Sequence, residues 1–584
     1  PREYKVMDCA CALGDRSACV NLHRHAQPRP SPPAIGRGRR EGNHVRYPAA
    51  VRHERRILCV FPAYSPSFGT FSHAYPLMDR VRAFMPPQGL LVIAAYLPER
   101  WQVRFVDENL SRAQAADFAW ADAVLVTGMH IQAAQIRAIG ARARAAGKVT
   151  VLGGPSVSAM PESYPEFDYL HIGEIGCATD RLIECLDASV APPARQVRLT
   201  TETRLPLDAF PQPAYHLIPL DRYFIGSVQF SSGCPYTCEF CDIPGLYGRV
   251  PRMKTPEQVM AELDAMLAQA RPPAVYFVDD NFIANRKATR DLLPHLIAWQ
   301  KRNGYPLRFA CEATLNLAKE PEILTLMREA HFITVFAGIE TPEIDTLDRM
   351  GKKQNMRVPI LDAVATLNSY GIEVVSGIIQ GLDGETAESG RLLLEFVERS
   401  QIPMLTINLL QALPGTPLWT RLEREGRIDL DPALESNVRF ARPYAEVVAT
   451  WKHCIAETYT PERLFQRFIH QINATYPNRI RIPAARQISM RNLRRGLVLA
   501  ANLAVRVGLL ADYRRVFWRA VWHALRQGQV ESAFNMGLVA HHLITFTREA
   551  VRGEQKASFY QAHARDEPAA EAPVVFSEPA ASQS

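Results

Sequence analysis

Three cysteines lie close together in the stretch SSGCPYTCEFCDIPGLYGR, residues 231–249. Cys234, Cys238 and Cys241 fall within eight residues. Thiolates on one short loop are the usual ligands of a [4Fe–4S] cluster, which normally takes four of them. A zinc site also needs a fourth Cys or His, and the nearest downstream histidine, His295, lies inside the expected helix DLLPHLIAWQ. The spacing therefore predicts a cluster with one iron left open for a small molecule.

The elements around this stretch predict a barrel. Six short apolar runs alternate with helical segments, and the cysteines follow the first run. The runs are GSVQFS, AVYFVDDNF, LRFACEATLN, ITVFAGIET, EVVSGIIQGLD and MLTINLLQALPGT. Alternating strands and helices indicate parallel βα units, whose chemistry lies at the carboxyl ends of the strands. We expect a partial (β/α)6 barrel with its linker over residues 199–425.

The segment before the barrel has the same alternation. RRILCVFPAY, QVRFVDENL, ADAVLVTGMH, VTVLGGPSVS and YLHIGEIG are apolar runs that end in small or polar residues. They predict an α/β domain of Rossmann-like type over residues 53–198, with ligands bound beyond the strand ends. Gly128, Gly153, Gly154 and Gly173 lie at those ends, where any one of them can also be a simple turn residue.

Composition limits the classes of protein that remain. A net charge of +7 over 584 residues argues against a dedicated nucleic-acid binder, and eleven cysteines with one cluster indicate reduced thiols in the cytoplasm. We find neither a secretory signal nor an apolar run of membrane-spanning length. Residues 1–52 are rich in Arg and Pro, and we expect them to be a disordered extension.

The C-terminal section, residues 426–584, is predicted to be mostly helical. Between Arg479 and Arg526 it has 11 Arg, no Lys and one acid, Asp512. Aromatic residues such as Trp518 and Trp522 interleave with these arginines, a pattern that suits an anionic membrane surface. An ordinary helical domain with a solvated basic face is an equally good interpretation of the pattern alone.

The spacing C-x-x-x-C-x-aromatic-C, with Phe240 as the aromatic residue, resembles the signature of the radical S-adenosylmethionine (SAM) enzymes. In that family the open iron binds SAM, and one electron cleaves SAM to give a 5′-deoxyadenosyl radical. The resemblance implies SAM contacts from Phe240 and from the ends of the second, fourth and fifth barrel strands, with Asp-Asp-Asn replacing the commoner Gly-Gly-Glu. The strand-end residues are Asp279, Asp280, Asn281, Glu340 and Gly381. For Asp280 and Glu340 a helix cap or a solvated loop residue is the alternative.

The N-terminal half resembles the cobalamin-binding domain that is fused to one large subclass of these enzymes. GGPSVSAMPE and HIGEIG carry the match. Many cobalamin domains bind cobalt through the histidine of Asp-x-His-x-x-Gly, but this chain has DENLSR at that strand end. We expect cobalamin without an imidazole ligand, because the intact glycine-rich strand ends disfavour the alternative of a vestigial domain. The implied cobalamin contacts are Asn109, Gly128, Gly153, Gly154, Pro155, Ser156, Gly173 and Glu174.

Residues 56–555 resemble, within this family, the methylases that act on hopanoids; FPAYSPSFGTFSHAYPL and LVAHHLI are among the matching segments. The resemblance implies methylation of a hopanoid such as diplopterol at ring carbon C-2, giving 2-methylhopanoids. An unactivated C–H bond has no acidic proton, so cofactors must carry the chemistry and we expect no protein general base.

The same resemblance implies partners. We expect a hopanoid substrate, a reducing protein such as flavodoxin or ferredoxin, and peripheral contact with the inner face of the membrane, but no nucleic acid. One alternative is another cobalamin-dependent radical SAM methylase or cyclase acting on a different lipid or natural product. The non-enzymatic alternative is an iron–sulfur electron carrier, which needs no open iron.

Overall fold

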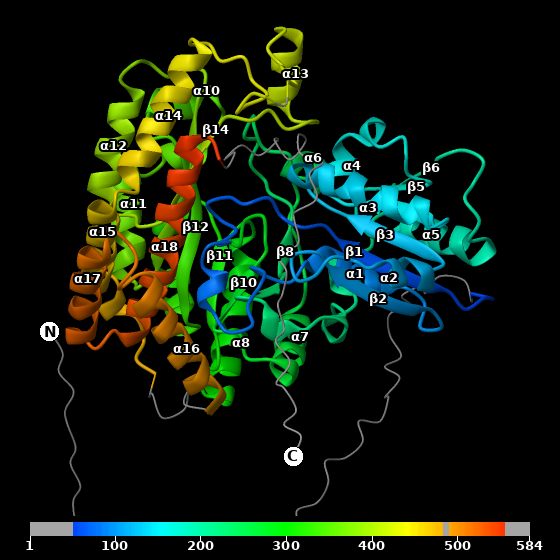
Figure 1. Cartoon of the computed structure of the whole chain (residues 1–584), viewed down its shortest axis with the longest axis horizontal. Helices are drawn as coiled ribbons and strands as arrows, with labels where there is room; N and C mark the ends of the chain where they lie inside the picture. The colour runs from blue at the N-terminus through cyan, green and yellow to red at the C-terminus, as the bar shows by residue number, and fades with distance from the viewer. Residues whose placement is uncertain (1–50, 432, 483–489, 555–584) are drawn as a thin grey trace, which may run out of the picture. The chain divides into compact units, whose positions relative to one another are not determined.

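Two sheets of parallel strands organise the chain, of which the computed structural model describes residues 51–431, 433–482 and 490–554 (Figure 1). The expected disordered extension over residues 1–52 therefore lies almost entirely outside the described residues. The first sheet has the order β2-β1-β3-β4-β5-β6. Its strands are β1 (Arg56–Phe61), β2 (Gln102–Asp107), β3 (Ala123–Thr127), β4 (Val149–Gly153), β5 (Tyr169–Ile172) and β6 (Val197–Thr200).

Helices cover both faces of this first sheet. They are α1 (Gln88–Tyr96), α2 (Ala115–Trp120), α3 (Ala133–Ala145), α4 (Pro155–Ala159) and α5 (Cys177–Ala188). Ile57 and Cys59 of β1 share one core with α1 and α5, whereas Leu58 and Val60 share the other with α2 and α3. Successive side chains of a strand point to opposite faces, so a continuous apolar run needs helices on both sides. The expected Rossmann-like α/β fold is confirmed.

Strand β6 is the one element of this sheet that the sequence did not predict. It lies at the edge of the sheet, pairs only with β5, and buries Leu199 alone of its four side chains. A short edge strand with one buried residue has no apolar run to reveal it. The boundary predicted at residue 198 falls inside this strand.

The second sheet is the expected partial barrel. Its order, β14-β13-β12-β11-β10-β7, follows the chain, and every neighbouring pair is parallel. All six predicted runs form its strands, which are β7 (Gly226–Val228), β10 (Ala274–Phe277), β11 (Arg308–Glu312), β12 (Phe332–Glu340), β13 (Glu373–Gln380) and β14 (Leu405–Leu409). Because all strands run the same way, their carboxyl ends share one rim.

Helices between these strands form the outer layer of the barrel. They are α7 (Pro256–Gln269), α8 (Arg286–Asn303), α9 (Pro321–Glu329), α10 (Ile344–Arg349), α11 (Ile360–Ser369) and α12 (Ser389–Ser400). The side chain of Thr255 caps α7 by accepting from the amide of Gln258, and that of Asn285 caps α8 in the same way.

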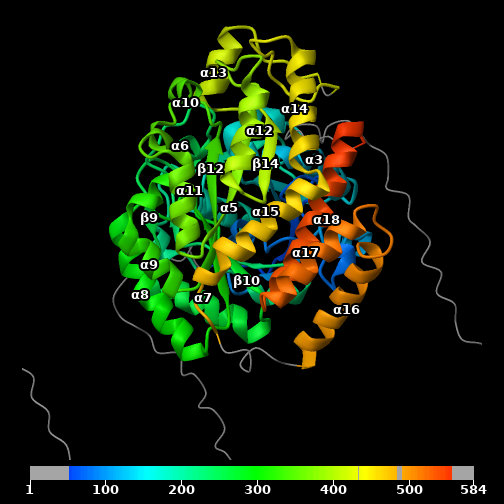
Figure 2. The same cartoon turned by 90° about the vertical axis from the view of Figure 1, so that its left-hand side faces the viewer.

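The C-terminal section is helical, as predicted. Its helices are α14 (Tyr444–Thr458), α15 (Pro461–Ala474), α16 (Met490–Arg506), α17 (Arg514–Arg526) and α18 (Val530–Arg552), and α13 (Pro417–Arg424) lies just before it. Figure 2 shows α15, α17 and α18 side by side, and the three helices contact one another. None of the helices in the described ranges combines the length and hydropathy that a membrane crossing requires.

The long loop after β1 reaches these C-terminal helices. His542 of α18 donates from Nε2 to the carbonyl oxygen of Ser67 at 3.0 Å. The ring of Phe68 lies 4.9 Å from that of Phe546, edge to face. The two segments FPAYSPSFGTFSHAYPL and LVAHHLI, far apart in sequence, are therefore packed against each other.

Candidate active site

The three cysteines occupy a loop that a small hairpin closes. Strand β8 (Ser231–Ser232) pairs antiparallel with β9 (Arg252–Met253), and the loop lies between them. The amide of Cys234 donates to the carbonyl oxygen of Gly248 at 3.1 Å. Gly233 has φ +96°, and a Cβ there would lie 3.0 Å from the same oxygen, so the turn requires glycine.

The donor set suits a cluster. Cys234, Cys238 and Cys241 are all free thiols, and Gln354 donates from Nε2 to the sulfur of Cys238 at 3.2 Å. Burial raises the pKa of Cys234 and Cys241, so these thiols stay protonated until a metal displaces the proton. In the described part of the chain no three His, Cys, Asp or Glu side chains converge on one metal ion. Cysteine thiolates are the usual ligands of an iron–sulfur cluster, so the three side chains fit that group.

Asp279 and Asp280, after β10, hold the start of the cysteine loop. Asp279 is buried and accepts from the amides of Phe230 and Ser231 at 2.8 and 2.9 Å. Asp280 accepts from the amide of Gly233 at 2.7 Å. Burial raises the pKa of Asp279 to about 7 and that of Asp280 to about 6. The next residue of the motif, Asn281, is also buried.

Glu340 ends β12 beside the cysteines. It forms a buried ion pair with Lys352, whose ammonium nitrogen lies 5.4 Å from the ring centre of Phe240. Glu340 has φ +67°, a left-handed conformation that costs a non-glycine residue about 1–3 kcal/mol. Lys352 and Gln354, which sequence reasoning missed, therefore bring the fourth strand end and the cysteine loop together.

Gly381, at the end of β13, faces the C-terminal section. A Cβ there would lie 2.5 Å from the ring of Phe440, and its φ is +90°. Its amide donates to Glu385 Oε2 at 2.9 Å. Gly381 thus allows close packing of the fifth strand end, and its contact with SAM stays a prediction. Its neighbour Leu382 lines the cavity described next.

A cavity of about 280 Å³ opens beside the cysteine loop. Phe240 and the segment after β13 were expected to share the SAM site, and both line this cavity. Its walls are Glu239, Phe240, Thr346, Arg349, Met350, Leu382, Asp383, Leu410, Leu418 and Arg421. Apolar walls with a few charged groups suit a nucleoside that carries polar substituents.

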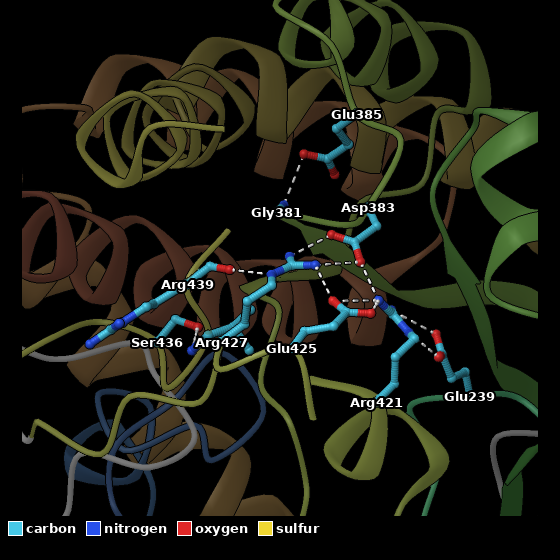
Figure 3. A network of polar contacts seen from close by, with 10 residues as sticks. Glu239, Gly381, Asp383, Glu385, Arg421, Glu425, Arg427, Ser436 and Arg439 are labelled. Carbon is cyan, nitrogen blue, oxygen red and sulfur yellow. Dashed lines mark hydrogen bonds and ion pairs between the residues drawn. The ribbon is translucent and has the colours of Figure 1, made fainter. Parts of the chain in front are cut away.

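A polar network closes one side of the cavity (Figure 3). Arg421 of α13 donates from Nε and Nη2 to the two carboxylate oxygens of Glu239, at 2.5 and 3.1 Å. Its Nη1 donates to Asp383 Oδ2 at 2.8 Å, and Arg427 donates to Asp383 Oδ1 at 2.6 Å. The amide of Leu418 donates to the carbonyl oxygen of Glu239 at 2.9 Å. Helix α13 therefore holds the residue between Cys238 and Phe240 through both its backbone and its side chain.

The predicted cobalamin residues gather at the carboxyl edge of the first sheet. Gly128 and Gly173 directly follow β3 and β5, and Gly153 is the last residue of β4 between them. Gly154 has φ +97°, and a Cβ there would lie 2.3 Å from Thr127 Oγ1, so the backbone turn needs glycine. Pro155 and Ser156 begin α4 directly afterwards. An edge without side chains lets a large ligand approach the backbone, which fits a corrinoid.

The three polar members of this set bind protein groups. Ser156 shares a hydrogen bond of 2.5 Å with the hydroxyl of Tyr164. Asn109 donates to Asp107 Oδ1 at 2.7 Å and accepts from the amide of Tyr64 at 2.8 Å. Glu174 forms ion pairs with Arg252 at 2.6 Å and Arg204 at 3.2 Å. Asn109 and Glu174 are thus held by neighbouring protein groups at this edge, and their contact with cobalamin remains a prediction.

Three family models match the chain. Residues 228–397 match the radical SAM superfamily, residues 76–182 the B12 binding domain, and residues 416–556 a domain of unknown function, DUF4070. The chain is 58% identical to the hopanoid C-2 methylase of Rhodopseudomonas palustris (strain TIE-1), over 88% of this chain and 97% of that protein. It is 33% identical to an uncharacterised methyltransferase of Synechocystis, over 88% of this chain and 96% of that one.

Solved structures share the fold. The radical SAM methyltransferase TsrM of Kitasatospora setae, with cobalamin and a [4Fe–4S] cluster bound, superimposes with a TM-score of 0.51 at 19% identity, covering 64% of this chain and 78% of TsrM. The cobalamin-dependent radical SAM enzyme OxsB gives a TM-score of 0.52 at 15% identity, covering 86% of this chain and 80% of OxsB.

A radical SAM barrel joined to a B12-binding sheet defines a class of enzyme, the cobalamin-binding radical SAM methyltransferases, whose cofactors are a [4Fe–4S] cluster, SAM and cobalamin. The 58% identity over nearly the whole length of both proteins identifies the family more narrowly than the class. The chain belongs to the hopanoid C-2 methylase family.

Proposed function

We propose that this chain methylates a hopanoid, such as diplopterol, at ring carbon C-2 and so forms 2-methylhopanoids. The observation that carries the proposal is the 58% identity with the Rhodopseudomonas hopanoid C-2 methylase over 97% of that protein. A shared fold alone is compatible with many substrates, but identity at this level over a whole chain favours a shared substrate.

Different parts of the chain hold different cofactors. Cys234, Cys238 and Cys241 hold the cluster, and Phe240 with the cavity beside it holds SAM. The strand-end glycines of the first sheet hold cobalamin. When bound, these groups supply the one-electron chemistry that an unactivated C–H bond requires, together with the methyl group. The protein positions the substrate carbon and excludes water from it.

We further propose that the enzyme works in the cytoplasm at the inner surface of the membrane, where a hopanoid is dissolved. The arginines and aromatic residues of α16 and α17 support this contact. A small reducing protein such as flavodoxin or ferredoxin supplies the electron that cleaves SAM.

Expression in a host that makes hopanoids but no 2-methylhopanoids tests the proposal. We expect mass spectrometry of the host lipids to detect 2-methylhopanoids. A variant with all three cysteines of the loop changed to alanine serves as the control and should produce none. If the expressing host contained the protein with its cluster and still made no 2-methylhopanoid, the substrate assignment would be wrong.

A further inference from the structure

Exposed apolar side chains gather on α16, on α17 and on the turn between them. Leu509 and Leu510 in the turn are 64% and 74% exposed, and Trp522 of α17 is 58% exposed. We call this surface the lipid face. It comprises Leu509, Leu510, Arg515, Trp518, Arg519, Trp522, Leu525 and Arg526.

Helix α17 presents these residues along one stripe. Arg515, Arg519, Trp522 and Arg526 are spaced three or four residues apart, and Trp518 precedes Trp522 by four, which places all five on one side of a helix. The other side is packed into the core by Phe517, Ala520, Val521 and Ala524. The stripe is therefore the solvent-exposed side of a helix whose opposite side is buried.

The turn continues this stripe. The indole nitrogen of Trp518 donates to the carbonyl oxygen of Gly508 at 2.9 Å. A Cβ on Gly508 would lie 2.6 Å from the same indole ring, so the two are in close contact. This contact sets the turn with Leu509 and Leu510 directly beside Trp518, and the apolar tip and the basic stripe form one surface.

The positive charge of the face is not neutralised within the described ranges. Arg514, Arg515, Arg519 and Arg526 form no ion pair with a described residue. The acidic residues near the two ends of α17 form ion pairs with other arginines. Asp512 pairs with Arg548, and Glu531 pairs with Arg308. Elsewhere on the surface, exposed arginines such as Arg391 and Arg290 pair with glutamates.

A groove of about 490 Å³ lies within this stripe. Arg519, Trp522, His523 and Arg526 line it, and His523 is fixed by a hydrogen bond between Nε2 and Asn473 Oδ1 of 2.7 Å. Two guanidinium groups beside an indole match a phosphate next to a lipid glycerol, because Arg donates in pairs to phosphate oxygens and Trp favours headgroup depth.

We propose that the lipid face binds anionic phospholipids, with the groove holding a headgroup phosphate and Leu509 and Leu510 entering the acyl region. This inference rests on the proposed function, because a substrate dissolved in the bilayer gives the enzyme a reason to bind there. The helix does not cross the bilayer, and its basic stripe and apolar tip are those of an interfacial helix.

Vesicle flotation of the full chain tests the proposal without SAM or hopanoid, so its outcome is independent of the methylation reaction. We expect binding to vesicles that contain phosphatidylglycerol but not to pure phosphatidylcholine, with a loss of binding at high salt. The variant R519Q/R526Q should bind anionic vesicles about 30-fold more weakly, because each arginine near such a surface contributes about a factor of five.

Two further variants complete the experiment. L509D/L510D should lose vesicle binding as well, since it places charge at the apolar tip. R391Q/R399Q removes two exposed arginines from α12, whose side chains are 64% and 63% exposed, and should bind as the wild type does. Equal flotation of R519Q/R526Q and the wild type, equal binding to neutral vesicles, or full competition by inorganic phosphate would each overturn the proposal.

Discussion

Buried charge distinguishes the residues that surround the cysteine loop. Glu340 and Lys352 form a pair that is almost fully buried, and Lys352 also lies over the ring of Phe240. Removing one partner of such a pair leaves an uncompensated buried charge, which costs about 3–5 kcal/mol. The pair therefore fixes the end of β12 against Phe240, which lines the proposed SAM cavity, and its charge lies close to the cysteines.

The buried carboxyl group of Glu385 leads to a prediction for the pH dependence of stability. Burial favours its neutral form and raises its pKa from 4.5 to about 7. The folded chain therefore holds this proton more tightly than the unfolded chain, so the stabilisation is complete below about pH 4.5 and is lost as the pH rises through about 7. E385Q cannot ionise and lacks this loss. We expect its melting temperature to rise relative to the wild type from pH 5 to pH 8; a difference that stays constant over this range would contradict the assignment.

At the scale of elements, helix α13 connects the domain of unknown function to the cysteine loop. It is the first helix within residues 416–556, and its residues Leu418 and Arg421 line the proposed SAM cavity. Arg421 and Glu239 are 182 positions apart in sequence, yet their side chains form an ion pair with two hydrogen bonds. The start of the domain matched over residues 416–556 thereby positions the cysteine loop.

Changing Arg421 tests this role. R421A removes three hydrogen bonds from Glu239 and Asp383, so we expect SAM to bind the reduced cluster about tenfold more weakly. Electron paramagnetic resonance of the reconstituted protein measures the change that SAM causes in the cluster signal. R424A, an exposed arginine on the same helix, is the matched control and should behave as the wild type.

The iron content of R421A separates positioning from general stability. We expect R421A to lose SAM binding, or part of its iron, while it melts close to the temperature of R424A. An R421A protein with a full cluster and wild-type SAM affinity would show that α13 does not position the loop.

Prediction from sequence succeeded where a signal is local. The barrel strands are continuous apolar runs such as AVYFV, so they were predictable. The spacing of Cys234, Cys238 and Cys241 places them on one loop, and their role as cluster ligands stays a prediction. Lys352, Gln354 and Arg421 reach the site from distant segments, and no spacing rule connects them to the cysteines. Their roles depend on tertiary contacts, which a single sequence does not contain.

At the scale of the whole molecule, an ion pair connects the two proposed cofactor sites. Glu174, at the carboxyl edge of the first sheet, pairs with Arg252 in the strand β9 that closes the cysteine loop. The same edge carries the predicted cobalamin residues Gly153, Gly154 and Gly173. An ion pair between the two parts suits an enzyme in which the source of the radical and the source of the methyl group act on one substrate carbon.

A labelling experiment with the reconstituted enzyme tests the central claim most directly. Purified protein with cluster and cobalamin is given a reductant, a membrane-dispersed hopanoid and SAM that carries a deuterated methyl group. The account predicts a hopanoid with a deuterated methyl group at C-2, formed together with 5′-deoxyadenosine. If 5′-deoxyadenosine accumulates with the cofactors bound and no label enters the hopanoid, or enters at another ring carbon, the account is contradicted.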